Sequence, residues 1–224
     1  MTTDARARLV AAAQTLSLTL TDAQLDQLLA YMDWLAKWNK VYNLTSLRDP
    51  AEMLSHHLID SLTAVRPLQL HVQALPAQAG SAPLRVLDVG SGGGLPGVVL
   101  AICLPQLQVT CVDTVSKKAA FIQQVAAALR LPNLKGLHAR VESIEGGFDV
   151  VASRAFASLV DFTTWSVKAL KPGAVWMAMK GKHPAEELAA LGAGVEVFHV
   201  EPLVVPGLDV ERCLVWMRVG ALAG

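Results

Sequence analysis

The chain has 224 residues, of which 53% are hydrophobic and 17% charged, and its 19 basic and 19 acidic residues cancel to a formal net charge of zero. This composition predicts one compact core with a modest extension and excludes an intrinsically disordered chain. The charge balance gives no bulk attraction for nucleic acid, although it leaves room for a local basic patch.

Residues 1–70 predict a helical N-terminal region. Thr21 and Gln24 have the spacing of a capping box, and leucines at helical intervals follow them. Asp49 and Pro50 mark the start of another helix, in which Asp49 can act as the cap. The apolar stripe of that helix consists of Leu54, Leu58, Leu62 and Val65.

Residues 71–83 are rich in Pro, Gly, Gln and Ala, and they predict a connector to a main domain over residues 84–224. In this domain strands and helices alternate. The expected strands cover residues 84–89, 108–112, 136–140, 148–153, 175–179, 195–200 and 213–219. The expected helices cover residues 96–104, 117–130 (capped by Ser116) and 159–170 (capped by Ser158). Such alternation predicts an α/β fold with a mostly parallel sheet, and the last two strands predict a hairpin that adds one antiparallel strand.

A glycine-rich loop follows the first strand of this domain, in the run from Asp88 to Gly97. Parallel sheets bind ligands beyond the carboxyl ends of their strands, and glycines let the backbone approach a ligand closely. The segment from Gly92 to Gly97 also matches the GxGxxG pattern of dinucleotide-binding folds, which alone is weak evidence. Counted from Gly90, however, Leu95 takes the place of the third glycine. The register therefore disfavours a dinucleotide.

Two aspartates lie near this loop. Asp88 stands two residues before the first glycine, where a carboxylate suits the amino group and sulfonium of S-adenosylmethionine better than a pyrophosphate. Alternatively, Asp88 only caps the loop amides. Asp113 ends the second strand, roughly 20 residues after Gly90, and can accept both hydroxyls of a ribose. It can also be a solvated acid at a strand end.

These motifs resemble the glucose-inhibited division protein B family, bacterial methyltransferases that modify guanine N7 in small-subunit ribosomal RNA. The loop from Asp88 to Gly97 is similar to the loop of that family. Further segments agree in family order and extend the resemblance over residues 30–182. They are Asn43-Leu44-Thr45, His57-Leu58-Ile59-Asp60-Ser61-Leu62, Ser153-Arg154-Ala155-Phe156-Ala157-Ser158-Leu159 and Lys180-Gly181. The Ser153–Leu159 run is the most specific.

The resemblance implies a class I methyltransferase fold, a Rossmann-like mostly parallel sheet with one antiparallel strand and a helical N-terminal extension. It implies S-adenosylmethionine as the cofactor. Gly90 and Leu95 should contact this cofactor, and Val141 and Glu142 should meet its adenine. Arg154 should lie beside the cofactor and the RNA, which makes it the candidate catalytic residue. The full set of expected cofactor-binding residues is Asp88, Gly90, Gly92, Gly94, Leu95, Asp113, Val141, Glu142 and Arg154.

The role of Arg154 stays open at this point. It can hold guanine through O6, donate to a phosphate, or pair with Asp149 or another acid. The sequence departs from the family pattern at His56, where arginine is usual, at Leu95, where an aromatic residue is often found, and at Thr114.

Guanine N7 has a free lone pair and no proton, so its methylation needs no general base. The sequence fits this chemistry, because it lacks both the Asn/Asp-Pro-Pro-Tyr run of exocyclic amine methylation and a Pro-Cys pair for covalent cytosine chemistry. An NAD-dependent oxidoreductase and a non-catalytic methyltransferase-like RNA-binding protein are the alternatives.

Basic side chains form two groups that either bind RNA or are simply solvated: Lys117, Lys118, Arg130, Lys135 and Arg140, and then Lys180 and Lys182. Trp34, Trp38 and Tyr42 can stack on bases, or pack their helix onto the core.

The expected partner is 16S ribosomal RNA or the small ribosomal subunit. Three scattered cysteines and an isolated His56-His57 pair predict no metal site and no disulfide. The sequence lacks a leader pattern and an apolar run of about 18 residues, so we expect a cytoplasmic monomer without a membrane partner.

Overall fold

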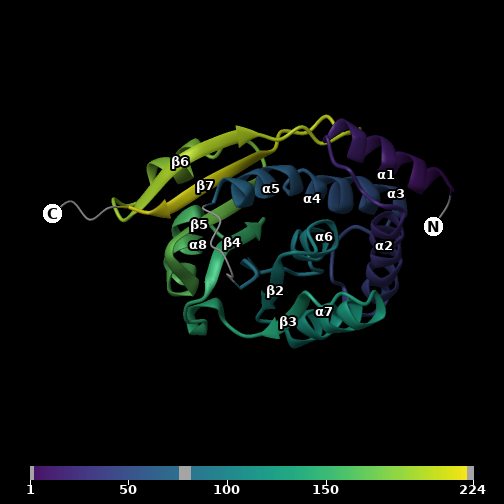
Figure 1. The fold of residues 1–224 in the computed structure, drawn as a ribbon, viewed down its shortest axis with the longest axis horizontal. Coiled ribbons are helices and arrows are strands. Elements are labelled where there is room, and N and C mark those ends of the chain that lie inside the picture. Colours follow the sequence, from purple (N-terminus) through teal and green to yellow (C-terminus); the bar gives the residue numbers. More distant parts are fainter. Residues whose placement is uncertain (1–2, 76–81, 221–224) are drawn as a thin grey trace.

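The computed structural model describes residues 3–75 and 82–220 (Figure 1). A twisted sheet forms its centre, and helices cover both faces. The strands are β1 (Arg85–Val89), β2 (Gln108–Asp113), β3 (Leu134–His138), β4 (Phe148–Arg154), β5 (Leu170–Lys180), β6 (Val195–Pro202) and β7 (Cys213–Val219). The α-helices are α1 (Thr3–Thr15), α2 (Asp22–Tyr42), α3 (Pro50–Met53), α4 (Asp60–Leu62), α5 (Val65–Ala74), α6 (Gly97–Cys103), α7 (Ser116–Ala128), α8 (Leu159–Ser166) and α9 (Ala185–Ala189).

The strand order is β3-β2-β1-β4-β5-β7-β6. All pairs from β3 to β5 are parallel, whereas β7 runs antiparallel to both β5 and β6. The predicted mostly parallel α/β sheet with one antiparallel strand is confirmed. The strand order changes direction next to β1, because β2 and β3 follow on one side of it and β4 and β5 on the other. In folds of this kind such a switch point forms a ligand-binding crevice.

Alternating side chains of the strands enter two separate cores. Val86, Val109 and Val150 pack with α6, α7 and the N-terminal helices. Leu87, Val151 and Trp176 point to the opposite face, where α8 covers them. Because these central strands are buried on both faces, they consist of nearly continuous apolar residues.

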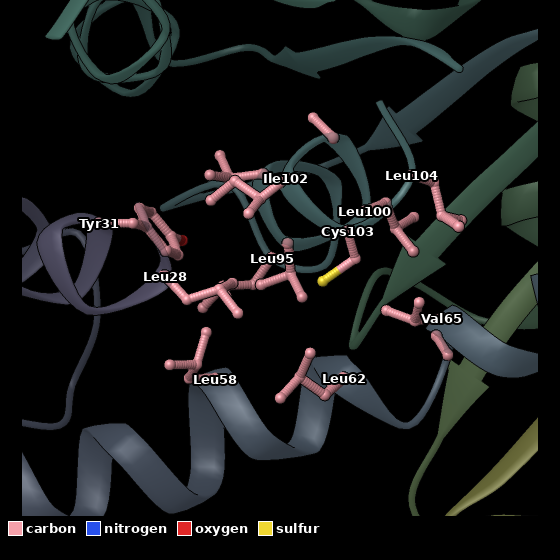
Figure 2. Close-up of a cluster of buried hydrophobic side chains, with 14 of the residues drawn as sticks. Leu28, Tyr31, Leu58, Leu62, Val65, Leu95, Leu100, Ile102, Cys103 and Leu104 are labelled. Atoms are coloured by element: carbon pink, nitrogen blue, oxygen red, sulfur yellow. The ribbon is translucent and has the colours of Figure 1, made fainter. Parts of the chain in front are cut away.

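The N-terminal helices pack directly against α6 (Figure 2). Leu28 and Tyr31 approach it from α2. Leu58, Leu62 and Val65 approach it from the helical segment over residues 54–65. All five side chains are at most 1% exposed. The helical extension and the sheet therefore share one hydrophobic core.

Local sequence signals explain how these helices begin. The predicted capping box of α2 is present: Thr21 Oγ1 accepts from the Gln24 backbone N–H at 3.2 Å, and the Gln24 side chain accepts from the Thr21 N–H at 2.9 Å. Asp49 Oδ1 accepts from the N–H groups of Ala51 and Glu52, both at 2.9 Å, as predicted for a cap. The helix that follows Asp49 contains a π-helical stretch over Leu54–Ile59.

Several expected boundaries were wrong. The connector does not begin at residue 71, because α5 continues to Ala74 and His71 stacks on Trp216 with ring centroids 4.8 Å apart. Residues 76–81 of the expected connector lie outside the described residues. Ser116 does not cap α7; the N-cap position is Val115, whose N–H donates to Asp113 Oδ1 at 2.9 Å.

The region between β4 and β6 also differs from the expectation. The helix after Ser158 ends at Ser166 and passes into a 3₁₀ turn over Val167–Ala169. Strand β5 already begins at Leu170, which pairs with Phe148, and a register shift between Phe148 and Val150 accommodates the early start. Helix α9 was not predicted. Ser158, by contrast, caps α8 as expected.

Candidate functional site

A cavity of about 520 Å³ lies at the carboxyl ends of β1, β2 and β3. This is the sheet edge at which parallel α/β folds bind their ligands, and the volume falls in the usual range for small-molecule sites. The lining residues are Val89, Gly90, Val112, Asp113, Thr114, Val115, Lys118, Ala139, Arg140, Val141, Glu142, Phe156 and Trp165.

Gly90 forms part of the cavity floor and touches Phe156. It has a φ of +64°, and a Cβ atom added there would lie 2.2 Å from Cδ2 of the Phe156 ring. The residues on either side of Phe156, Ala155 and Ala157, also have positive φ values of 52° and 42°. Such values are strained for alanine. The strained loop therefore holds the Phe156 ring against Gly90.

Asp113 joins the glycine loop to the end of β2. One carboxylate oxygen accepts from the Gly92 N–H at 3.0 Å, the other accepts from the Val115 N–H at 2.9 Å, and Lys118 Nζ lies 3.5 Å from the first. The carboxylate is 6% exposed and lines the cavity. A carboxylate oxygen has two lone pairs, so each can accept one more hydrogen bond from a ligand hydroxyl.

Asp88 does not line this cavity. Its side chain is fully buried, and Oδ2 accepts from the Gly97 N–H at the start of α6 at 2.8 Å. Burial raises the pKa of Asp88 to about 7, against the smaller opposing effect of the Gly97 hydrogen bond. The arrangement matches the alternative in which the carboxylate caps loop amides.

Gly94 and Leu95 lie on the side of the loop that faces the hydrophobic core. Gly94 has a φ of +91°, and a Cβ atom there would lie 2.4 Å from a methyl carbon of Val98. Leu95 is 5% exposed and packs in the core rather than facing the cavity. Tyr31 of α2 adds a hydrogen bond from its hydroxyl to the Gly93 carbonyl at 2.6 Å.

Val141 and Glu142 form a 3₁₀ turn after β3 and lie on the cavity wall. Trp165, on α8, completes the wall, with its ring edge-on to Phe156 at 6.0 Å. Trp165 was not predicted as a site residue, because nothing local in a helix signals a role in a distant cavity. Lys118 and Arg140 were predicted only as RNA-binding or solvated basic residues, and Phe156 only as a member of the Ser153–Leu159 run.

The side chain of Arg154, at the end of β4, turns toward the N-terminal helices and does not line the cavity. Nη1 donates to Asp60 Oδ2 at 2.8 Å and to the His56 carbonyl at 3.0 Å. Nη2 lies 3.5 Å from His57 Nδ1. Of the pairings that the sequence left open, the structure shows one with an acid, and this acid is Asp60 rather than Asp149.

Trp34 and Trp38 of α2 pack against the core, as the second alternative predicted, whereas Tyr42 is exposed. Trp38 contacts Phe121 of α7 with centroids 5.4 Å apart and Tyr42 at 5.0 Å. Lys117 Nζ lies 5.3 Å above the Tyr42 ring. Trp38 is thus a packing residue of the interface between α2 and α7.

A second cavity, of about 350 Å³, lies among α1, α2 and α3 and contains none of the expected site residues. Within residues 3–75 and 82–220, no cluster of three or more His, Cys, Asp or Glu side chains is arranged to hold a metal ion. No helix in the described part of the chain is long and apolar enough to cross a membrane.

The sequence matches the GidB family, described as rRNA small subunit methyltransferase G, over residues 24–215. The chain belongs to this family. It is 63% identical to the Ribosomal RNA small subunit methyltransferase G of Polaromonas naphthalenivorans (strain CJ2), with 95% of each chain covered. It is 62% identical to the protein of the same name from Paracidovorax citrulli (strain AAC00-1), which covers 97% of this chain and 92% of that one.

Solved structures support the fold of this GidB family member. A SAM-dependent methyltransferase from Aquifex aeolicus aligns with a TM-score of 0.54 and 17% identity over 76% of this chain and 98% of that one. TrmN from Thermus thermophilus aligns with a TM-score of 0.53 and 18% identity over 74% of this chain and 53% of that one. The fold is that of class I methyltransferases, and S-adenosylmethionine is the cofactor of the family.

Proposed function

We propose that this GidB family member transfers a methyl group from S-adenosylmethionine to N7 of a guanine in 16S ribosomal RNA. Family membership over residues 24–215 carries this proposal. The relatives at 62% and 63% identity bear the name Ribosomal RNA small subunit methyltransferase G. Guanine N7 as the acceptor atom rests on the family resemblance of the Ser153–Leu159 run.

The cavity at the carboxyl edge has the groups that the cofactor needs. Asp113 is available to accept the ribose hydroxyls. Gly90 presents only its backbone to the cavity, because the Phe156 ring occupies the space that a side chain would take. Val141 and Glu142 are available to the adenine on the neighbouring wall. Gly92, Gly94 and Leu95 act indirectly, through the shape of the loop. Asp88 fixes the loop to α6 through Gly97.

When bound, S-adenosylmethionine supplies an electrophilic methyl group on a sulfonium. The acceptor nitrogen of guanine brings its own lone pair, so the protein needs no general base. Its residues have to hold the acceptor in line with the methyl group and keep water out. Phe156 and Trp165 give the cavity an apolar wall suited to this task. We assign Arg154 a positioning role, because its guanidinium is bonded to Asp60 and to the His56 carbonyl and does not line the cavity.

Methylation of small-subunit RNA from cells that lack this protein tests the function. Incubation with labelled S-adenosylmethionine should incorporate label, and mass-spectrometric mapping should find the product at guanine N7. Asp113→Asn should raise the Kd for the cofactor, because one charged acceptor for the ribose is lost. A methyl group on any other base atom would contradict the proposed acceptor.

The alternatives separate in a thermal-melt assay. We expect S-adenosylmethionine and its demethylated product to raise the Tm and NADH to leave it unchanged. Stabilisation by NADH alone would instead support an oxidoreductase. Cofactor binding without any incorporation of label would support the non-catalytic RNA-binding protein.

The cellular context follows from the proposed substrate. Bacterial ribosomal RNA is in the cytoplasm, and we propose that the protein acts there as a monomer. Light scattering on the purified protein measures its mass, and a mass near 23.8 kDa is the expected result.

A further inference from the structure

One carboxylate binds two arginines at the carboxyl edge of the sheet. Asp60 accepts from Arg154 Nη1 at 2.8 Å through Oδ2 and from Arg212 Nε at 2.8 Å through Oδ1. The three residues come from distant parts of the chain: the N-terminal helices, the end of β4 and the segment immediately before β7. The Asp60 side chain is 4% exposed, whereas those of Arg154 and Arg212 are 18% and 26% exposed.

This cluster carries an excess positive charge. Two guanidinium groups face one carboxylate, and the neighbouring His57 adds no charge to the cluster. Burial, together with the charge of Arg154, lowers the pKa of His57 to about 4, so the imidazole is neutral at pH 7. The cluster therefore has a formal charge of plus one in a half-buried position, where a charge interacts more strongly than in bulk water.

Among the described residues, some donors of the two guanidinium groups have no partner. Arg212 uses Nε for Asp60 and Nη1 for the Glu211 carbonyl at 2.9 Å. Its Nη2 makes no hydrogen bond within the described residues, and neither does Nε of Arg154. The Arg212 backbone is fixed, because its carbonyl accepts from the Leu203 N–H at 2.8 Å. Arg212 thus presents unused donors from a rigid position.

The cluster and the proposed cofactor cavity lie at the same edge of the sheet. Arg154 precedes Phe156 by two residues, and Phe156 lines that cavity. Strands β4, β5 and β7 are neighbours, with Arg154 opposite Met179 and Lys180 opposite Cys213, so Arg212 reaches the same sheet edge. Lys180 at this edge is already neutralised by Glu187 at 2.7 Å.

We propose that Arg212, together with Arg154, binds a backbone phosphate of the RNA substrate, and that Asp60 is the residue that positions the two guanidinium groups. Arginine binds phosphate through its planar set of donors, and phosphate contacts fix the register of a protein on its nucleic acid. This inference rests on the proposed function, because it names the RNA group that the same sheet edge holds.

RNA binding by Arg212→Gln tests the site apart from catalysis. Filter binding of 16S ribosomal RNA, measured at several salt concentrations, gives the affinity and its salt dependence. Loss of one phosphate contact should lower the slope of log K against log salt by roughly 0.7, which corresponds to a roughly fourfold weaker affinity near 0.15 M salt. The Kd for S-adenosylmethionine should not change.

Two variants serve as controls. Arg212→Lys keeps the charge and should retain the wild-type salt slope. Arg218→Gln removes another ion-paired arginine from β7, which is bonded to Glu196 and lies outside the cluster, and should leave RNA affinity unchanged. Thermal melts of all variants check that each protein is folded. Asp60 keeps Arg154 as its partner in the Arg212 variants.

The possible failures are distinct. Wild-type RNA affinity and salt slope in a folded Arg212→Gln variant would overturn the phosphate site, while methylation by the wild-type protein still stood. A weaker affinity for S-adenosylmethionine in this variant would assign the arginines to the cofactor carboxylate and also overturn the proposal. Failure of the proposed function would appear as the absence of methylation by the wild-type protein.

Discussion

The side chain of Asp88 places an ionisable group in the fully buried centre of the fold. Burial raises its pKa from 3.8 to about 7. Between these two pH values, Asp88 is therefore protonated in the native state and ionised in the unfolded chain. The free energy of unfolding therefore falls as pH rises from about 4 to about 7 on account of this group, and its contribution is greatest at low pH.

Replacing Asp88 by asparagine should remove this dependence. Asparagine keeps a carbonyl oxygen for the Gly97 N–H and has no charge to bury. We expect the difference in unfolding free energy, wild type minus Asp88→Asn, to decrease as pH rises from about 5 to about 8. Urea denaturation at both pH values measures it. Parallel curves for the two proteins would show that Asp88 does not titrate in this range.

Gly90→Ala should impair the cofactor cavity. The added Cβ would lie 2.2 Å from the Phe156 ring, and the φ of +64° is unfavourable for alanine. The ring has to move into the cavity, so we expect the Kd for S-adenosylmethionine to rise at least tenfold, or about 1.4 kcal/mol. Titration calorimetry measures this value. Gly192→Ala is the matched control, since its Cβ would meet no atom within 4 Å.

Individual site residues could be predicted where the sequence around them carries a local signal. Glycines in the loop and an aspartate at the end of β2 carry local signals, and the structure places Gly90 and Asp113 in the cavity. The partner of Arg154 could not be predicted, because Asp60 is 94 residues away in the chain and meets it only in the folded protein. The spacing of Asp88 from the glycines could not tell whether its carboxylate faces a ligand or α6, because that depends on how α6 packs on the sheet.

Helix α2 supports the glycine loop from outside the sheet. The buried Tyr31 hydroxyl donates to the Gly93 carbonyl at 2.6 Å, and a Cβ on Gly93 would lie 2.8 Å from a methyl carbon of Leu35. Figure 2 shows the Tyr31 ring directed at the Leu95 side of the loop. The N-terminal extension thus contributes to the cavity without lining it.

Tyr31→Phe should separate this support from simple packing. The ring stays, but the Gly93 carbonyl loses its buried donor, which costs about 1–2 kcal/mol of stability. If the hydrogen bond also fixes the loop, the Kd for S-adenosylmethionine should rise roughly two- to tenfold. Tyr42→Phe, on the same helix with 41% of its residue surface exposed, is the control. A stability loss with unchanged cofactor affinity would refute the positioning role.

Elements were predicted well where one local signal dominated. Apolar strands and capped helix starts at Thr21, Asp49 and Ser158 were found from the sequence. The start of β5 was missed, because Pro172 and Gly173 indicate a turn, whereas pairing of Leu170 with Phe148 begins the strand before them. The short α9 has no buried residue and hence no apolar periodicity to reveal it.

The molecule as a whole should unfold in one step. Leu28, Leu58 and Leu68 from the N-terminal helices share a continuous core with Val98 and Val109 of the sheet layer. We therefore expect a single calorimetric transition in which the van't Hoff and calorimetric enthalpies agree. A fragment of residues 84–224 should fail to fold, because that core face would be exposed to water. Two resolved transitions, or a stable fragment, would contradict a shared core.

The reversed direction of β7 has a practical consequence for experiments on this protein. Because β7 is antiparallel to β5, it starts at Cys213 on the edge that carries the proposed binding residues and ends at Val219 on the opposite edge (Figure 1). A fluorescent reporter or an immobilisation tag attached directly after Val219 would lie on the side away from the proposed RNA-binding edge. Surface-tethered binding measurements should therefore use that end of β7.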